Sequence, residues 1–199
     1  MGRLNDAIRH YHNALRVFTK EDYPQDFAVL HNNLAIAYLS IPMSDERGKM
    51  REALAVQSFE EVLKVINLID HPSEYAMINN NLGNALQYSS ASHALVNNIR
   101  AIEAYDEALK VRNPRDTPME YANTIANKAN VLRSLPDDTE DLSKGNRENL
   151  KRSFALYEEA KTIFKHFGQM QGVTQISETL KEISQELNAA ISAGNGFAN

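Results

Sequence analysis

Apolar residues recur three and four positions apart in several segments of the chain, and polar stretches separate these segments. Such spacing brings the apolar side chains to one face of an α-helix. The pattern predicts an all-α fold with about eight helices, near residues 3–20, 25–40, 50–68, 73–88, 96–112, 118–134, 147–167 and 172–187. Each helix would bury its apolar face against a neighbour.

The helices come in pairs that repeat along the chain. The first helix of each pair is called helix A. Each helix A begins with the pattern Asp-x-Pro-x-acid-aromatic-Ala, which occurs at Asp22, Asp70 and Asp116, that is, 48 and 46 residues apart. Periods of this size indicate an array of helix pairs. The second helices, helices B, keep the same register through an aromatic residue at Tyr11, Phe59, Tyr105 and Tyr157.

The start of helix A has a physical explanation. Proline is tolerated at the first helical position because the missing N–H would have no partner there. An acidic residue follows two positions later, where the helix dipole favours a negative charge. These acids are Asp26, Glu74 and Glu120, and the segment from Thr117 to Glu120 also fits a capping box.

A column of small residues lies on the apolar face of helix A, at Ala35, Gly83 and Ala129. A small side chain at this position would let helix B approach closely. The neighbouring columns carry the larger apolar residues, among them Leu34, Leu82, Tyr38, Leu86 and Leu132. We therefore expect this face of helix A to be buried.

Three segments carry a family pattern: NNLA at 32–35, NNLGNA at 80–85 and A-x-x-x-Y-x-x-A-L at 101–109. They resemble the tetratricopeptide repeat (TPR) family, and the double Asn is similar to its kinesin-light-chain-like branch. The resemblance implies a right-handed α-solenoid of antiparallel helix hairpins. The repeats here exceed the usual length of about 34 residues, because extra residues lie between helix A and helix B.

The repeats suggest how the chain is organised. A single array would span residues 1–188. It would contain an unpaired helix B at 3–20, repeats at 22–70, 71–115 and 116–168, a capping helix at 170–188 and a flexible tail at 189–199. Because the chain opens on a helix B, we expect a fragment of a longer array; the alternative is that this helix forms an N-terminal lid.

The resemblance also implies where a ligand would bind, since helices A line the concave face in this family and ligands lie there in extended form. Residues of helix A that the packing does not use would then face the groove. The predicted groove residues are Val29, Asn32, Ile36, Met77, Asn80, Asn84, Asn123, Asn130, Arg133, Glu178 and Glu182. Along this series the groove changes from apolar through amide-rich to acidic.

The asparagines of the groove suggest backbone recognition, because an amide side chain both donates and accepts hydrogen bonds. We hypothesise that Asn80, Asn84, Asn123 and Asn130 hold a peptide backbone, while the acidic end favours a basic segment. A second set, Asn33, Asn81 and Asn127, is interpreted as structural. The family's clamp for C-terminal carboxylates is disfavoured, because Arg133 and Lys128 alone supply positive charge in this region.

Composition narrows the classes of function. The 199 residues carry a net charge of −5, which argues against non-specific nucleic-acid binding. No apolar run approaches the length of a membrane span, and Met1 does not open a signal peptide. The absence of Cys excludes disulfides and suits a reducing compartment, so we expect a cytoplasmic protein.

Motifs for catalysis and for cofactor or metal binding are absent from the sequence, which predicts neither an enzyme nor a cofactor. The acidic stretch at 137–141 does not fit the calcium-loop frame and is interpreted as a solvated loop. Glu178 and Glu182 lie one helical turn apart, a spacing that surface helices commonly show. We expect a non-enzymatic adaptor for a protein or peptide partner. The alternatives are homo-oligomerisation and a sensor or scaffold fragment of a larger signalling protein.

Overall fold

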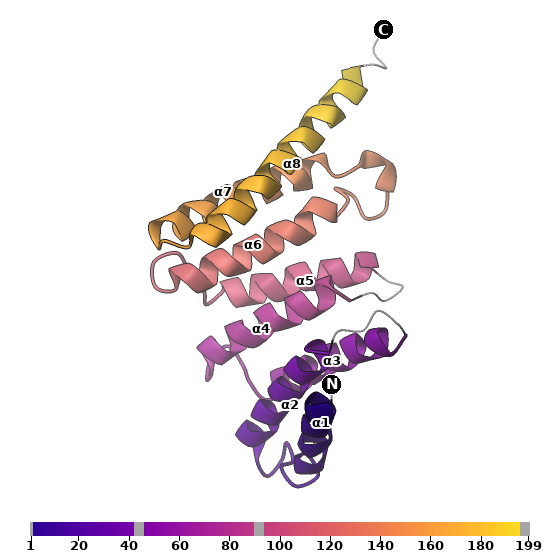
Figure 1. The fold of residues 1–199 in the computed structure, drawn as a ribbon, viewed down its shortest axis with the longest axis vertical. Coiled ribbons are helices and arrows are strands. Elements are labelled where there is room, and N and C mark those ends of the chain that lie inside the picture. The colour runs from indigo at the N-terminus through magenta and orange to yellow at the C-terminus, as the bar shows by residue number, and fades with distance from the viewer. Residues whose placement is uncertain (1, 42–45, 90–93, 196–199) are drawn as a thin grey trace. The chain divides into compact units, whose positions relative to one another are not determined.

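A computed structural model describes residues 2–41, 46–89 and 94–195 of the chain, with side chains to residue 188. Over these residues it contains eight α-helices, and helices adjacent in sequence pack as antiparallel neighbours within each compact unit (Figure 1). The helices are α1 (Gly2–Ala14), α2 (Pro24–Leu39), α3 (Glu46–Leu63), α4 (Pro72–Gln87), α5 (Ala94–Leu109), α6 (Pro118–Ser134), α7 (Arg147–His166) and α8 (Met170–Asn195). The all-α prediction is confirmed.

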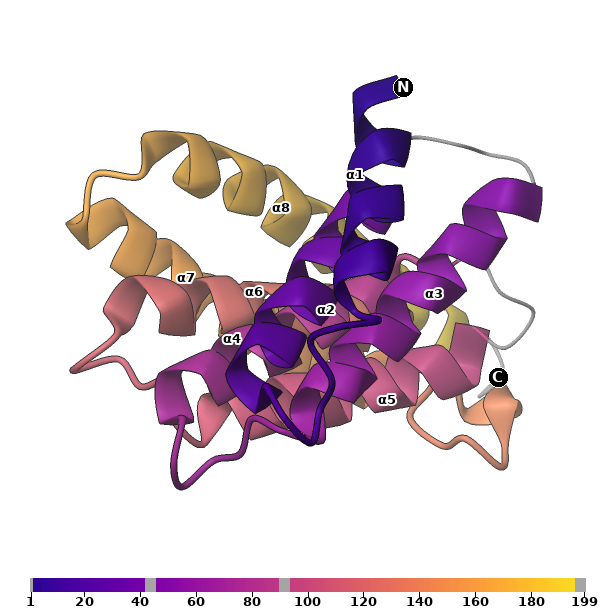
Figure 2. The ribbon, with the colours of Figure 1, turned by 90° about the horizontal axis from the view of Figure 1, so that it is seen from below.

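The chain divides into two compact units, Met1–Val111 and Arg112–Asn199. In the first, α1 packs on α2, α2 on α3, α3 on α4 and α4 on α5 (Figure 2). Its core contains the predicted large and aromatic columns, with Leu34, Phe59, Ile78, Leu86 and Tyr105 fully buried. The predicted hairpins of the first two repeats are thus present, and the single array of 1–188 stays a prediction.

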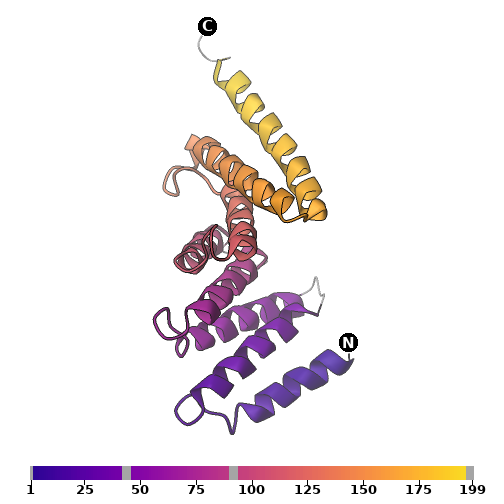
Figure 3. The same cartoon turned by 90° about the vertical axis from the view of Figure 1, so that its left-hand side faces the viewer.

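In the second unit α6 packs on α7 and α7 on α8 (Figure 3). Its core contains Ile125, Val131 and Ile183, all of which are buried, and the hydroxyl of Ser153 donates to the carbonyl oxygen of Ala129 at 2.7 Å. This buried hydrogen bond ties α7 to α6 at the small-residue column. The third predicted repeat therefore also forms a helix hairpin.

The three helices A begin in the same conformation. The residue before each proline, at Tyr23, His71 and Thr117, has φ between −138° and −135° and ψ between 55° and 61°. The capping box expected at Thr117 is wrong, because no side-chain hydrogen bond caps this helix. The hydroxyl of Thr117 instead accepts from the backbone N–H of Asn113 at 3.0 Å, in the preceding turn.

The turns that join one repeat to the next are also equivalent. The side-chain oxygens of Thr19, Asn67 and Asn113 each accept the backbone N–H of the residue three positions on, at 3.2, 2.9 and 2.8 Å. Local bonds of this kind compete with helical ones. Helices α1, α3 and α5 end at 14, 63 and 109, before the predicted ends at 20, 68 and 112, and each is followed by turn residues that lead into these bonds.

The connection between α7 and α8 is a helix C-terminal turn. Gly168 has φ 71°, and the N–H groups of Gly168 and Gln169 bond to the carbonyl oxygens of Lys165 and Phe164 at 3.2 and 2.8 Å. This is the Schellman arrangement, in which glycine supplies the left-handed residue. A new helix, α8, then begins at Met170, within two residues of the predicted start near 172.

The last helix is longer than predicted. It continues to Asn195, beyond the predicted end near 187, and the flexibility expected from residue 189 stays a prediction. The sequence from 188 to 193, NAAISA, is rich in Ala, the residue with the highest helix propensity. The remaining residues, 196–199, lie outside the described part of the chain.

Candidate functional site

Two helices of the first unit, α2 and α4, carry exposed apolar side chains, and two of those on α2 are seven residues apart. Val29 and Ile36 of α2 are 59% and 46% exposed, and Met77 of α4 is 41% exposed. Residues seven apart lie two turns apart on the same side of a helix. The exposed faces of α2 and α4, together with the ends of α3 that contact them, are called the α2–α4 wall below.

The first cavity of this wall lies at the N-terminal halves of α2 and α4. Its volume is about 300 Å³, and three predicted groove residues, Val29, Asn32 and Met77, line it. The other lining residues are Gln25, Ala28, Val62, Ile66, His71, Glu74 and Ile78. The cavity therefore has an apolar floor and a rim of polar side chains.

Two polar atoms at this cavity lack a hydrogen-bond partner within the described residues. They are Oδ1 of Asn32 and Nδ1 of His71, and both are buried. A buried polar atom without a partner costs free energy, on the order of 1–3 kcal/mol. Glu74, in contrast, is exposed, and none of the residues that line the cavity is Lys or Arg. The electrostatic character of the rim is therefore negative.

A second cavity, of about 280 Å³, lies at the C-terminal ends of the same two helices. Asn84 is the predicted groove residue that lines it. Tyr38, Leu39, Ile41, Gly48, Glu52, Ala85 and Tyr88 complete the lining. Two predicted residues, Ile36 and Asn80, lie on α2 and α4 at turns between the two cavities.

Asn84 is tied to the core of its own hairpin. The Tyr105 hydroxyl lies 2.8 Å from Oδ1 of Asn84 and 3.0 Å from Oε1 of Gln87. A phenol has one proton, so it donates to one amide oxygen, and the other amide must turn its NH₂ group toward the phenol oxygen. The structure thus gives Asn84 a packing role as well as a place at the second cavity.

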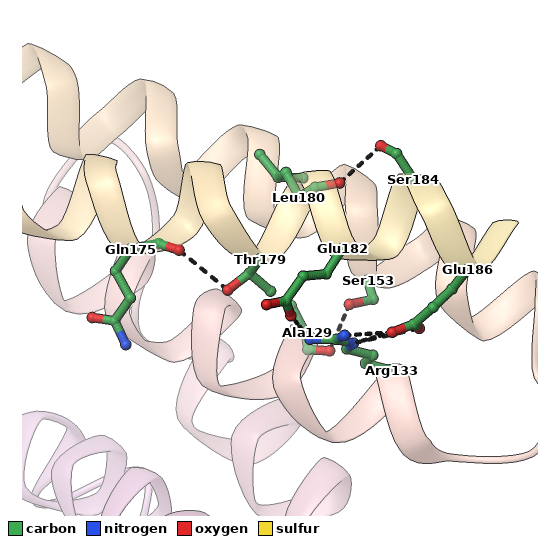
Figure 4. Close-up of polar contacts among 9 residues, drawn as sticks. All are labelled: Ala129, Arg133, Ser153, Gln175, Thr179, Leu180, Glu182, Ser184 and Glu186. Carbon is green, nitrogen blue, oxygen red and sulfur yellow. Dashed lines mark hydrogen bonds and ion pairs between the residues drawn. The ribbon is translucent and has the colours of Figure 1, made fainter. Parts of the chain in front are cut away.

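The predicted groove residues of the second unit are arranged differently. Asn123 and Asn130 are exposed on α6, and Glu178 is exposed on α8. Arg133 of α6 binds two acids of α8, with its Nη1 2.9 Å from Oε2 of Glu182 and its Nε 3.2 Å from Oε1 of Glu186 (Figure 4). Arg133 therefore offsets one of the two negative charges of Glu182 and Glu186, which weakens the acidic end that was expected to attract a basic segment.

Several wall residues were not predicted from the sequence, namely His71, Glu74, Glu52 and Tyr88. Glu74 lies three positions before Met77, and Tyr88 lies four positions after Asn84. The stripe of predicted groove residues on α4, extended by one helical turn at each end, includes both Glu74 and Tyr88. Glu52 belongs to a helix B, so a search restricted to helix A could not find it.

The acidic stretch between α6 and α7 is internally bonded rather than only solvated. Asp137 accepts from the backbone N–H groups of Glu148 and Asn149 at 2.8 and 2.7 Å, and so caps α7. Asp138 bonds to Lys144 at 2.5 Å. Over the residues that the structure describes, no three His, Cys, Asp or Glu side chains are grouped in a way that could hold a metal ion.

Neither family models nor curated proteins nor solved structures give a match to this chain. None of the helices in the described ranges combines the length and the apolar character that crossing a bilayer needs. The α2–α4 wall, with its two cavities, is the candidate binding site.

Proposed function

We propose that this protein is a non-enzymatic interaction module that binds an extended segment of a partner protein on the α2–α4 wall. The observation that carries the proposal is the pair of cavities at the two ends of the wall, with Ile36 exposed between them. Clustered apolar side chains on a surface commonly mark an interaction site. The module would act as a scaffold or adaptor.

The recurring geometry of the hairpins supports the array architecture that the sequence suggests. The residues before the prolines share one backbone conformation, and Thr19, Asn67 and Asn113 form equivalent turns. Together with the resemblance to tetratricopeptide repeats, these features favour a right-handed α-solenoid in which α2 and α4 are helices A.

The proposal is tested by selecting binders from a random dodecapeptide library displayed on phage. Peptides that bind the wild-type chain should lose at least tenfold in affinity on Met77→Lys, because the charged side chain would enter the rim of the first cavity. The matched control is Met50→Lys, since Met50 is 66% exposed on α3 and lines neither cavity. Circular dichroism checks that both variants fold.

Two outcomes would refute the proposal. The first is a selection in which no peptide distinguishes Met77→Lys from Met50→Lys. The second is equal affinity of the enriched peptides for the wild type and for both variants, which would place their site elsewhere.

Self-association is the second candidate function, and it rests on α1. Over Gly2–Ala14 no residue is buried, although Ile8 and Tyr11 are half-covered by α2. A further surface packed on α1 would bury the rest of this face. Light scattering after size exclusion measures the mass directly, and a dimer that Ile8→Glu converts to a monomer would support this function.

A further inference from the structure

The two cavities of the α2–α4 wall define a spacing. On α4 the first cavity is lined by Glu74, Met77 and Ile78, and the second by residues about ten positions later, among them Asn84 and Tyr88. On α2 the shift from Val29 to Leu39 is the same. At a rise of about 1.5 Å per residue, the cavities are about 15 Å apart along the wall.

For an extended peptide, the distance between the cavities fixes the number of residues that separate the two side chains that enter them. Its side chains alternate, so only residues an even number apart point to the same side, and each residue advances the chain by about 3.3 Å. A separation of four residues covers about 13 Å and one of six about 20 Å. Four is the closer match to the distance between the cavities, whereas a helical ligand would need about ten residues.

The charge of the first cavity adds a second requirement. Glu74 is exposed at its rim, and its carboxylate forms no hydrogen bond or ion pair with another described residue. Gln25 and Asn32 are neutral polar residues that also line this cavity. A cation on the ligand would meet the Glu74 carboxylate at close range.

We infer that the wall takes a basic, extended peptide segment with two large apolar side chains four residues apart and a Lys or Arg within two residues of the first. The first apolar side chain occupies the cavity at Val29 and Met77, and the second occupies the cavity at Leu39 and Tyr88. The inference rests on the proposed function, and it names the partner's chemistry at that site.

The spacing is tested with peptides enriched from the random dodecapeptide library on the wild-type chain. Each is resynthesised with a fluorescent label and with its two apolar residues two, three, four, six or ten positions apart. Fluorescence anisotropy should show the tightest binding at four, with at least a tenfold loss at three. Equal affinity at all spacings, or an optimum at ten, overturns the inference.

The charge is tested separately by Glu74→Lys, with Glu103→Lys as the matched control because Glu103 is exposed on α5 and lines neither cavity. Glu74→Lys should lower the affinity for Lys-containing peptides at least fivefold, and Glu103→Lys should change it less than twofold. Enrichment of acidic peptides by the wild type would contradict the assignment.

These experiments separate the inference from the function on which it rests. If the binding of peptides depends on Met77 but not on their spacing or charge, the proposed function is supported and the inference about a two-cavity ligand is refuted. If no peptide depends on Met77, both proposals fail. A concentration-dependent dimer that Met77→Lys dissociates would assign the wall to a second copy of this chain and would also overturn the inference.

Discussion

The backbone of Gly83 lies so close to the Tyr105 ring that a Cβ atom at residue 83 would be 2.5 Å from Cε1 of the tyrosine. The ring has no room to retreat, because Tyr105 is fully buried and its hydroxyl bonds to Asn84 and Gln87. Helix α4 and helix α5 are therefore in direct contact at this point. The prediction that a small residue in this column lets helix B approach helix A closely is confirmed at Gly83.

Gly83→Ala should destabilise the first unit. Alanine favours a helix over glycine by about 1 kcal/mol, but overpacking a tight core costs about 1–3 kcal/mol. The clash with a fixed ring places the substitution at the upper end of that range, so we expect a net loss of about 1–2 kcal/mol. Urea unfolding followed by circular dichroism measures the change in the free energy of unfolding.

Gly172→Ala is the control for this experiment. A Cβ atom at residue 172 would lie 3.0 Å from Cδ2 of Phe164, a milder contact on a different helix pair. The gain in helix propensity should offset more of the strain, so the change should be smaller than for Gly83→Ala. An equal or greater loss at Gly172 would contradict the assignment of close packing to Gly83.

His31 should make the first unit less stable in acid. Its ring packs on that of Phe27, with centroids 4.4 Å apart, and its Nδ1 atom is buried without a partner in the described residues. Burial lowers the pKa of His31 below its usual value of 6.5, although the nearby Glu61 opposes the shift. The unfolded state then binds a proton more readily than the native state, and stability falls as the pH drops below about 6.5.

An NMR titration of the histidine ring signals measures the His31 pKa directly. His31→Asn tests the consequence, because the equivalent residue of the next repeat is Asn79, which donates to the carbonyl oxygen of Tyr75 at 3.0 Å. This variant should lose part of the acid destabilisation between pH 6.5 and 5. A His31 ring that titrates at or above 6.5 would be the opposite of what its burial implies.

The sequence predicted much of the fold because the helical stripe depends only on spacing along the chain. The small-residue column of α2, α4 and α6, at Ala35, Gly83 and Ala129, was predicted to be buried and is buried. The ends of α1, α3 and α5 were not predicted correctly, since apolar residues continue into the turns that follow these helices, where Thr19 and Asn67 bond to the backbone. Spacing alone does not distinguish such a turn from a further turn of helix.

The candidate site was harder to predict because side-chain partners come from distant parts of the chain. Exposure of Val29, Ile36 and Met77 followed from the periodicity. The bond from Tyr105 to Asn84 joins residues 21 apart, and the one from Arg133 to Glu186 joins residues 53 apart. Such contacts depend on how helices are placed in space, which the sequence pattern constrains only loosely.

Tyr121 should confer alkaline sensitivity on the second unit. Burial, followed by its 2.9 Å hydrogen bond to Glu159, raises the pKa of Tyr121 to about 12, against about 10 when unfolded. The stabilisation is fully present below pH 10 and is lost as the pH rises toward 12, because the unfolded state releases its proton first. Since Tyr121 is half-exposed, the effect should be well below the full linkage value.

Tyr121→Phe removes the titrating group, so its unfolding free energy should fall less between pH 10 and 12 than that of the wild type. Urea midpoints at several pH values give this comparison. The control is Tyr23→Phe, which removes the phenol of an exposed tyrosine in the first unit. Parallel curves for the wild type and Tyr121→Phe would contradict the prediction.

Arg133 should stabilise the packing of α8 on the rest of the second unit. It reaches Glu182 and Glu186 from α6, and its own side chain is 26% exposed, so the three charges form a network rather than an isolated surface pair. Exposed ion pairs contribute at most about 1 kcal/mol, and paired networks reach the upper end of that range. Arg133→Gln should therefore cost about 1 kcal/mol at low salt and less at 1 M salt, where screening is strong.

Lys151→Gln serves as the control, because Lys151 pairs within its own helix with Glu148, both on the exposed side of α7. Its effect should be a few tenths of a kcal/mol, as for other pairs one turn apart. A double-mutant cycle between Arg133→Gln and Glu186→Gln isolates the coupling between the two helices. A coupling energy near zero would contradict the prediction. It would show that α8 is held by its apolar face, through Leu180 and Ile183, and that the charges do not contribute to stability.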